Sequence, residues 1–347
     1  MRKFLSLFWI AIVVSMVFLG IWFLENSGKE IVSPFGSRQK DQKPLEPGNK
    51  YSSYTFEALS QKNFPQGEIK LTNATRKEEN YTTYVFTYKS DGKTISGMAN
   101  IPSGQGPFPV IVLLRGWVDR SEYYIGLGTE RSANFLAEHG FLTLAPDFLG
   151  YGYSDWEDQD ILIARFYRPV EVLNLVASIP GLPKANPEKI GLWGHSNGGQ
   201  IALSLLEITK KGYPTSLWAP VSLGFPDSVL IYMGKEEDVG NVVKEKIDEF
   251  SLENDPKEYS IAEYFNKIKA PFIIHQGKAD ALIETSWTQN LVNKLKTVGN
   301  EVDFYLYSGE NHNFNYYTDT GDKLRLRDLE FFQKELKDQN PAVDSRQ

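Results

Sequence analysis

Between residues 189 and 203 the chain reads Lys-Ile-Gly-Leu-Trp-Gly-His-Ser-Asn-Gly-Gly-Gln-Ile-Ala-Leu, and this stretch decides the fold. Ile190 to Trp193 is an apolar run of strand length, and apolar side chains at helical spacing follow Gly199. Ser196 falls at the junction, with a glycine two residues before it and another two residues after it. Glycine has no Cβ, so strand and helix can approach closely and expose the serine hydroxyl on a strained turn. The stretch therefore predicts a nucleophile elbow.

A serine at such a turn needs a base, because its hydroxyl attacks almost nothing at its free pKa. The chain has four histidines. His312 lies in a loop after the strand-like run Val302 to Tyr307, and we predict that it is the base. His139, in a helix-to-strand turn, and His195, inside the elbow, are predicted to be structural or local, and His275 precedes any plausible acid.

The acid is expected between Ser196 and His312, because in this type of site the order along the chain is serine, acid, histidine. Asp280 lies in a glycine-containing turn that leaves the apolar run 271–275, where a carboxylate can orient an imidazole. We predict Asp280 as the acid. Asp227 also follows an apolar run and is the alternative, and either residue could instead be an ordinary solvated carboxylate.

Acyl transfer also needs hydrogen-bond donors that face the developing oxyanion. We predict that the backbone N–H of Asn197 is one donor, because Asn197 directly follows the nucleophile. The loop after the apolar run Val110 to Leu114 supplies the second, and we predict the Trp117 N–H. A hydroxyl of Tyr123 or Tyr124 is the alternative for this second donor.

Strand-like and helix-like segments alternate along most of the chain, which favours an α/β fold with a mostly parallel central sheet between helices. The predicted strands are Val110 to Leu114, Phe141 to Ala145, Ile190 to Trp193, Ser216 to Leu223, Pro271 to His275 and Val302 to Tyr307. The predicted helices are Arg131 to Glu138, Leu162 to Ile179, Gln200 to Lys210 and Ser286 to Lys296. Earlier segments, Glu68 to Leu71, Tyr81 to Lys89 and Thr94 to Ile101, are expected to form antiparallel N-terminal strands, with a hairpin turn at 90–93.

From about Ile69 to Leu336 the chain resembles the α/β-hydrolase superfamily, most closely the catalytic domains of prolyl oligopeptidases and dienelactone hydrolases. The segments that carry the likeness are the oxyanion-type loop 114–117, the strand-end loop 146–154, the elbow 194–199, the acid-type loop 268–280 and the base-type loop 309–314. One departure is Arg115, which stands where a histidine is common.

The resemblance implies a serine hydrolase that cleaves ester or peptide bonds through an acyl-enzyme, with a prolyl oligopeptidase-like peptidase favoured. A carboxylesterase for acylated sugars, aromatic esters or lipids is the alternative within this class. A hypothesis of another class is a non-catalytic, membrane-tethered binding protein that has kept the hydrolase fold.

The N-terminus predicts a membrane segment. Arg2 and Lys3 precede an uncharged run, residues 4–24, that is long enough to cross about 30 Å of hydrocarbon as a helix. It has no Ala-x-Ala-like cleavage site, so an uncleaved single-pass anchor is favoured over a signal peptide, with the catalytic domain extracytoplasmic. The expected domains are an anchor at 1–25, a flexible linker at 26–50 and a hydrolase domain at 51–340, with a small helical lid at about 225–268.

Composition excludes several other classes. The 347 residues carry a formal net charge of −7 at pH 7 without a basic cluster, so nucleic acid is not an expected partner. The chain has no cysteine and therefore no disulfide. We expect no metal and no cofactor, because no histidine pair has ligand spacing and no phosphate-binding loop is present. The expected partner is a small ester or short peptide substrate, and the oligomeric state stays open.

Overall fold

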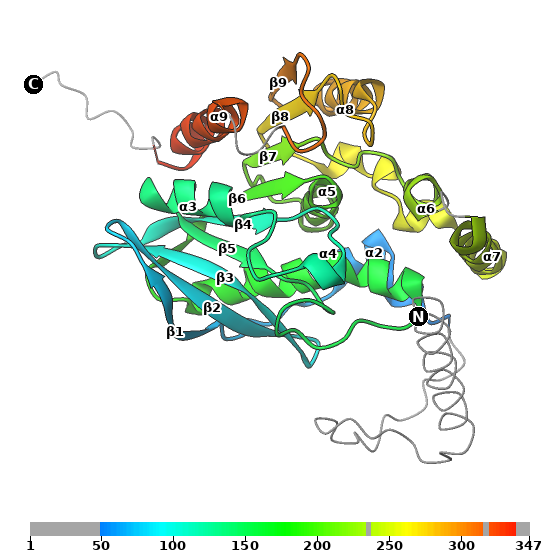
Figure 1. The fold of residues 1–347 in the computed structure, drawn as a ribbon. Coiled ribbons are helices and arrows are strands. Elements are labelled where there is room, and N and C mark those ends of the chain that lie inside the picture. The colour runs from blue at the N-terminus through cyan, green and yellow to red at the C-terminus, as the bar shows by residue number, and fades with distance from the viewer. Residues whose placement is uncertain (1–48, 234–236, 315–318, 338–347) are drawn as a thin grey trace, which may run out of the picture. The chain divides into compact units, whose positions relative to one another are not determined.

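The computed structural model describes residues 49–233, 237–314 and 319–337. Within these ranges one sheet of nine strands has the order β1-β2-β3-β5-β4-β6-β7-β8-β9 (Figure 1). The strands are β1 (Lys70–Lys77), β2 (Tyr81–Ser90), β3 (Lys93–Pro102), β4 (Phe108–Leu114), β5 (Leu142–Pro146), β6 (Ala185–His195), β7 (Thr215–Trp218), β8 (Phe272–Gly277) and β9 (Val302–Tyr307).

The sheet is parallel from β5 to β9 and antiparallel at its N-terminal strands. β5, β4, β6, β7, β8 and β9 pair in parallel, and β1, β2, β3 and β5 pair antiparallel. The hairpin between β2 and β3 closes at the pair Ser90 and Lys93, where the sequence predicts a turn. The predicted α/β-hydrolase architecture is thus confirmed, and the parallel strands all end at the same edge of the sheet.

Helices cover both faces of the sheet (Figure 1). Side chains of α2, α4, α5 and α8 pack into the core on one face, and those of α3 and α9 pack on the other. The helices are α2 (Phe56–Gln61), α3 (Glu130–Glu138), α4 (Ile161–Ser178), α5 (Asn197–Thr209), α6 (Asp227–Met233), α7 (Glu237–Glu253), α8 (Thr285–Thr297) and α9 (Asp319–Leu336). Single turns of 3-10 helix are η1 (Ser52–Tyr54), η2 (Arg120–Glu122), η3 (Ile179–Gly181), η4 (Pro256–Tyr259), η5 (Ile261–Glu263) and η6 (Phe265–Lys267).

The central strand β4 explains why the sheet must be covered on both sides. Val110, Val112 and Leu114 face one core cluster, whereas Ile111 and Leu113 face the other, and all five are fully buried. A strand whose side chains alternate between two apolar layers reads as a continuous apolar run, as the sequence does here.

The structure differs from the predicted elements at several places. β1 runs from Lys70 to Lys77, where the sequence predicts a strand at 68–71, and β6 begins at Ala185, before the predicted start at Ile190. β7 ends at Trp218 instead of continuing to Leu223, because Ala219 takes a positive φ of 40° and Val221 turns to hydrogen-bond the elbow. Near the end of the predicted helical lid, the chain forms only the short turns η5 and η6. The helix α9 was not predicted.

The predicted membrane segment, residues 4–24, lies outside the described residues. Among those that are described, none belongs to a helix with both the length and the hydropathy of a membrane span. The helices α6 and α7 and the turns η4, η5 and η6 lie in the segment predicted as a lid, and its action as a lid stays a prediction.

The buried carboxylate of Asp328 on α9 connects this helix to three strands of the sheet. Asp328 accepts hydrogen bonds from the indole N–H groups of Trp193 at 3.1 Å and Trp218 at 2.8 Å, and from the hydroxyl of Ser216 at 2.6 Å. The imidazole Nε2 of His275 is its fourth partner, at 3.1 Å. Because β6, β7 and β8 all contribute to this network, the carboxylate fixes the strands that carry the elbow and the acid loop.

We predict that Asp328→Ala lowers the stability of the fold by about 3 kcal/mol or more, because it leaves four buried donors without an acceptor. Thermal unfolding followed by circular dichroism should show a fall in Tm of roughly 5–10 °C. Glu330→Ala removes an exposed carboxylate from the same helix and should leave Tm nearly unchanged. Equal Tm values for the two variants would contradict the assigned role of Asp328.

Candidate active site

The predicted elbow is a strand–turn–helix unit in the structure. β6 ends at His195, α5 begins at Asn197, and Ser196 between them has φ 53° and ψ −120°. This backbone conformation is strained for a residue with a Cβ. Three backbone hydrogen bonds hold it: the Ser196 N–H donates to Trp218 at 3.0 Å, and the Ser196 carbonyl accepts from Val221 and Gly199, both at 3.0 Å.

Close backbone contacts explain the glycines around the serine. A Cβ on Gly198 would lie 1.9 Å from the carbonyl oxygen of Leu114 at the end of β4. A Cβ on Gly116 would lie 3.1 Å from the Cβ of Ser196. The loop that follows β4 therefore passes directly beside the serine, which is where an oxyanion loop has to run.

The structure joins the predicted acid to the predicted base. The Nδ1 atom of His312 lies 2.9 Å from the Oδ2 atom of Asp280. Asp280 also accepts hydrogen bonds from the backbone N–H groups of Leu282 at 2.8 Å and Ile283 at 2.9 Å. Burial raises the pKa of Asp280, but the hydrogen bonds from His312 and Ile283 outweigh that effect, and the pKa lies below its ordinary value. The ionised carboxylate holds the proton of His312 on Nδ1, which leaves Nε2 as an acceptor.

The alternative acid lies elsewhere. Asp227 is the exposed first residue of α6, and the imidazole of His312 bonds to Asp280. His139 bonds through Nδ1 to the carbonyl of Phe135, within its own helix turn. Both residues are local features, as the sequence indicated for His139.

His195 has a larger part in the site than the sequence suggested. Its Nε2 lies 3.0 Å from the carbonyl oxygen of His312, and the two imidazole ring centroids are 4.9 Å apart. Burial, followed by the charge of His312, lowers the pKa of His195 to about 4, so its ring is neutral near pH 7 and donates from Nε2. The residue adjacent to Ser196 thus anchors the loop of the predicted base. The only sequence signal for this role was the position of His195 directly before Ser196.

The predicted oxyanion donors lie on the two segments that flank Ser196. Asn197 is the first residue of α5, where the backbone N–H groups have no partner within the helix. Trp117 follows Gly116 in the loop beside the serine, and its side chain is 74% exposed. The hydroxyl of Tyr123, one alternative donor, instead donates to the carboxylate of Asp147 at 2.5 Å. Tyr124, the other alternative, is exposed.

Arg115 stiffens the loop that carries Gly116. Its guanidinium donates to the carbonyls of Gly116 at 2.9 Å and Asp147 at 2.8 Å. The same group lies 4.0 Å from the ring centroid of Tyr151 and 4.6 Å from that of Tyr123, as cation–π contacts. This buried arginine, which departs from the family pattern, therefore locks the loop after β4 to the loop after β5.

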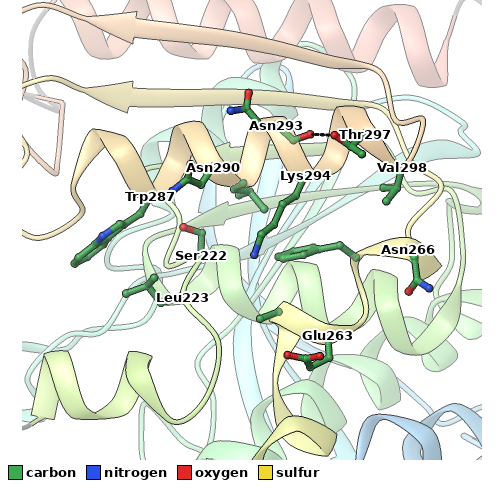
Figure 2. A pocket seen from close by; sticks show the side chains of 13 residues that line it. Ser222, Leu223, Glu263, Asn266, Trp287, Asn290, Asn293, Lys294, Thr297 and Val298 are labelled. Atoms are coloured by element: carbon green, nitrogen blue, oxygen red, sulfur yellow. Dashed lines mark hydrogen bonds between the residues drawn. The ribbon is translucent and has the colours of Figure 1, made fainter.

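A groove of about 550 Å³ lies between α8 and the turns η5 and η6 (Figure 2). Trp287 and Leu223 lie at one end of it, and Asn266 and Val298 lie toward the other. Ser196, Asp280 and His312 are not among its lining residues, so the groove is separate from the predicted reaction centre. No group of three or more His, Asp or Glu side chains suited to a metal ion occurs within the part of the chain that the structure describes.

Comparisons with known proteins identify the family of the chain. The sequence model of the prolyl oligopeptidase family matches residues 129–339, more than half of the chain. YtmA of Bacillus subtilis strain 168, described as an uncharacterized peptidase, is 26% identical over 243 residues, which cover 67% of this chain and 86% of YtmA.

Two solved structures show the same fold. Acetyl xylan esterase 1 from Thermoanaerobacterium sp. JW/SL YS485 has a TM-score of 0.60 and 15% identity, over 81% of this chain and 93% of the esterase. The acylaminoacyl peptidase of Pyrococcus horikoshii has a TM-score of 0.57 and 19% identity, over 77% of this chain and 43% of the peptidase.

The family match argues against the hypothesis of a non-catalytic binding protein. The matched residues, 129–339, include the elbow and the two loops that carry Asp280 and His312. The chain is a serine hydrolase of ester or peptide bonds and belongs to the prolyl oligopeptidase family.

Proposed function

We propose that Ser196 is the nucleophile, His312 the general base and Asp280 the residue that orients His312. The hydrogen bond of 2.9 Å between Asp280 and His312, on a loop anchored to the elbow by His195, carries this proposal. Ser196 Oγ attacks the substrate carbonyl while His312 Nε2 takes its proton. The N–H groups of Asn197 and Trp117 stabilise the oxyanion, and His312 then protonates the leaving group.

The acyl-enzyme formed on Ser196 is hydrolysed by water that His312 activates in turn. Asp280 stays ionised in this scheme, because its lowered pKa keeps it charged while His312 gains and loses a proton. The neutral ring of His195 adds no charge beside the cationic form of His312.

We favour a peptidase that acts on short peptides, and a carboxylesterase is the second candidate. The match to the prolyl oligopeptidase family and the likeness to YtmA favour amide cleavage. The fold shared with an acetyl xylan esterase favours the second candidate less strongly, because fold similarity alone does not select a substrate.

We also propose that the chain is a single-pass membrane protein whose catalytic domain is extracytoplasmic. The support is in the sequence: the uncharged run 4–24 follows Arg2 and Lys3, and basic residues remain on the cytoplasmic side of a membrane segment.

We predict that the wild-type enzyme hydrolyses aminoacyl 4-nitroanilides as well as 4-nitrophenyl acyl esters. Ser196→Ala should lower kcat on both by roughly 10⁶-fold, because the nucleophile is lost. Release of nitroaniline and nitrophenol, followed spectrophotometrically, gives both rates. Hydrolysis of esters alone would favour the carboxylesterase, and activity that persists in Ser196→Ala would refute the assigned nucleophile.

We predict that Asp280→Asn lowers kcat by about 10⁴-fold, because an amide in this position holds the wrong tautomer of His312. Asp227→Asn is the matched control at the alternative acid and should change kcat by less than about twofold. Steady-state kinetics on one 4-nitrophenyl ester compares them. A larger effect at Asp227 than at Asp280 would exchange the roles of the two carboxylates.

We predict that the full-length chain sediments with membranes and that a variant lacking residues 1–25 does not, because only the former keeps the apolar run. Protease added to intact spheroplasts should digest the hydrolase domain if it is extracytoplasmic. Recovery of the full-length chain in the soluble fraction, or its protection from added protease, would contradict the proposed location.

A further inference from the structure

Arg165 joins three helices around the elbow. It lies near the start of α4, and its Nη2 donates to the side-chain oxygen of Gln200 at 2.6 Å and to the hydroxyl of Ser228 at 2.8 Å. Gln200 is in the first turns of α5, four residues after Ser196, which is about 6 Å along a helix axis. The Gln200 amide donates to the carbonyl of Leu223 at 3.0 Å, which turns its oxygen toward Arg165.

The charge of Arg165 has no counter-ion. Both acceptors of its guanidinium are neutral, and no described carboxylate lies within ion-pair distance of it. By contrast, Arg76 is paired with Glu130, and Arg168 with Glu171. A partly buried cation without a partner is unfavourable. Burial lowers the pKa of Arg165 to about 10, which still leaves it charged at neutral pH.

Part of the guanidinium is unused. Nε and Nη1 make no hydrogen bond to any residue that the structure describes. They are also not among the described buried atoms that lack a partner, so both are open to solvent. Both two-nitrogen edges of a guanidinium include Nη2, which already binds Gln200 and Ser228. Nε and Nη1 point to different sides, and each is left to donate a single charge-assisted hydrogen bond to a carboxylate oxygen.

Tyr232 connects Arg165 to the acid loop. This α6 residue donates its hydroxyl to the carbonyl of Leu282 at 3.4 Å, and the Leu282 N–H in turn bonds to Asp280. Burial raises the pKa of Tyr232 to about 12, with a further increase from the charge of Asp280 and a decrease from that of Arg165. Tyr232 lies one helical turn after Ser228, the α6 residue that Arg165 contacts, so α6 links Arg165 to the loop that carries Asp280.

We propose that Arg165 binds a carboxylate group of the substrate and so gives the enzyme a preference for anionic esters or peptides. This inference rests on the proposed function, because the carboxylate belongs to the molecule that Ser196 attacks. The carboxylate belongs either to the acyl part, as in an acidic side chain or a dicarboxylic half-ester, or to the leaving group, as at the C-terminus of a short peptide. Arg165 acts here as a specificity-determining residue and takes no part in proton transfer.

Two substrate pairs test this inference and separate the two sources. The acyl pair is the 4-nitrophenyl monoester of glutaric acid against 4-nitrophenyl pentanoate, and the leaving-group pair is 4-carboxyphenyl acetate against its methyl ester. Wild-type enzyme should show a higher kcat/KM for the anionic member of one pair. Arg165→Met should reduce that kcat/KM by roughly tenfold or more, mainly through KM, and leave the neutral member within about twofold.

Three further variants separate specificity from structure. Arg165→Lys should restore part of the preference, because the positive charge returns without the planar guanidinium and its fixed donors. Lys244→Met removes an exposed, ion-paired charge from α7 and should leave the preference unchanged. If the enzyme turns over none of the four compounds, each can be tested as a competitor of a fluorophosphonate probe. The degree to which it slows labelling of wild type and of Arg165→Met then gives the same comparison.

The outcomes are distinct. Equal losses on the anionic and neutral members in Arg165→Met, or no anionic preference in either pair for wild type, would overturn the role of Arg165 while leaving Ser196 as the nucleophile. Activity or labelling that persists in Ser196→Ala would instead refute the proposed function itself.

Discussion

The hydrogen bond between Asp280 and His312 is the interaction on which the site depends. It joins two loops that leave neighbouring parallel strands, β8 and β9, at the same edge of the sheet. Further hydrogen bonds hold each partner in place. The N–H groups of Leu282 and Ile283 donate to the carboxylate of Asp280, and His195 bonds to the backbone carbonyl of His312. Because its ring is held at Nδ1 and its backbone is held by His195, His312 is positioned in advance for general-base catalysis.

The same edge brings in the other parts of the site. The strained turn at Ser196 is possible because Gly198 lets the start of α5 lie against the end of β4. Beneath the sheet, Asp328 ties β6, β7 and β8 to α9. Beside the serine, the Arg115 guanidinium lies against the rings of Tyr123 and Tyr151 and holds the loop after β4 to the loop after β5. The reaction centre is therefore built on rigid elements, and the uncompensated charge of Arg165 is held by the elbow helix.

Much of the fold was predictable because its signals are local. β9 was predicted with its observed bounds, and the elbow was recognisable because glycine is required where backbones touch. The order of serine, acid and histidine allows both Asp227 and Asp280, and the glycine-containing turn after the apolar run 271–275 favoured Asp280. What sequence patterns missed depends on distant contacts. β7 stops early because Val221 bonds to Ser196, and His195 reaches the carbonyl of His312, far along the chain. The uncompensated charge of Arg165 likewise becomes visible only once α4, α5 and α6 are brought together.

A crystal structure of the protein after reaction with a fluorophosphonate tests the convergence of the three side chains most directly. We predict a covalent bond from phosphorus to Ser196 Oγ and a phosphonyl oxygen that accepts from the Asn197 N–H. We also predict His312 Nε2 at about 2.6–3.2 Å from Ser196 Oγ, with the bond to Asp280 retained. An adduct on another residue, or an imidazole of His312 turned away from Ser196, would contradict this convergence.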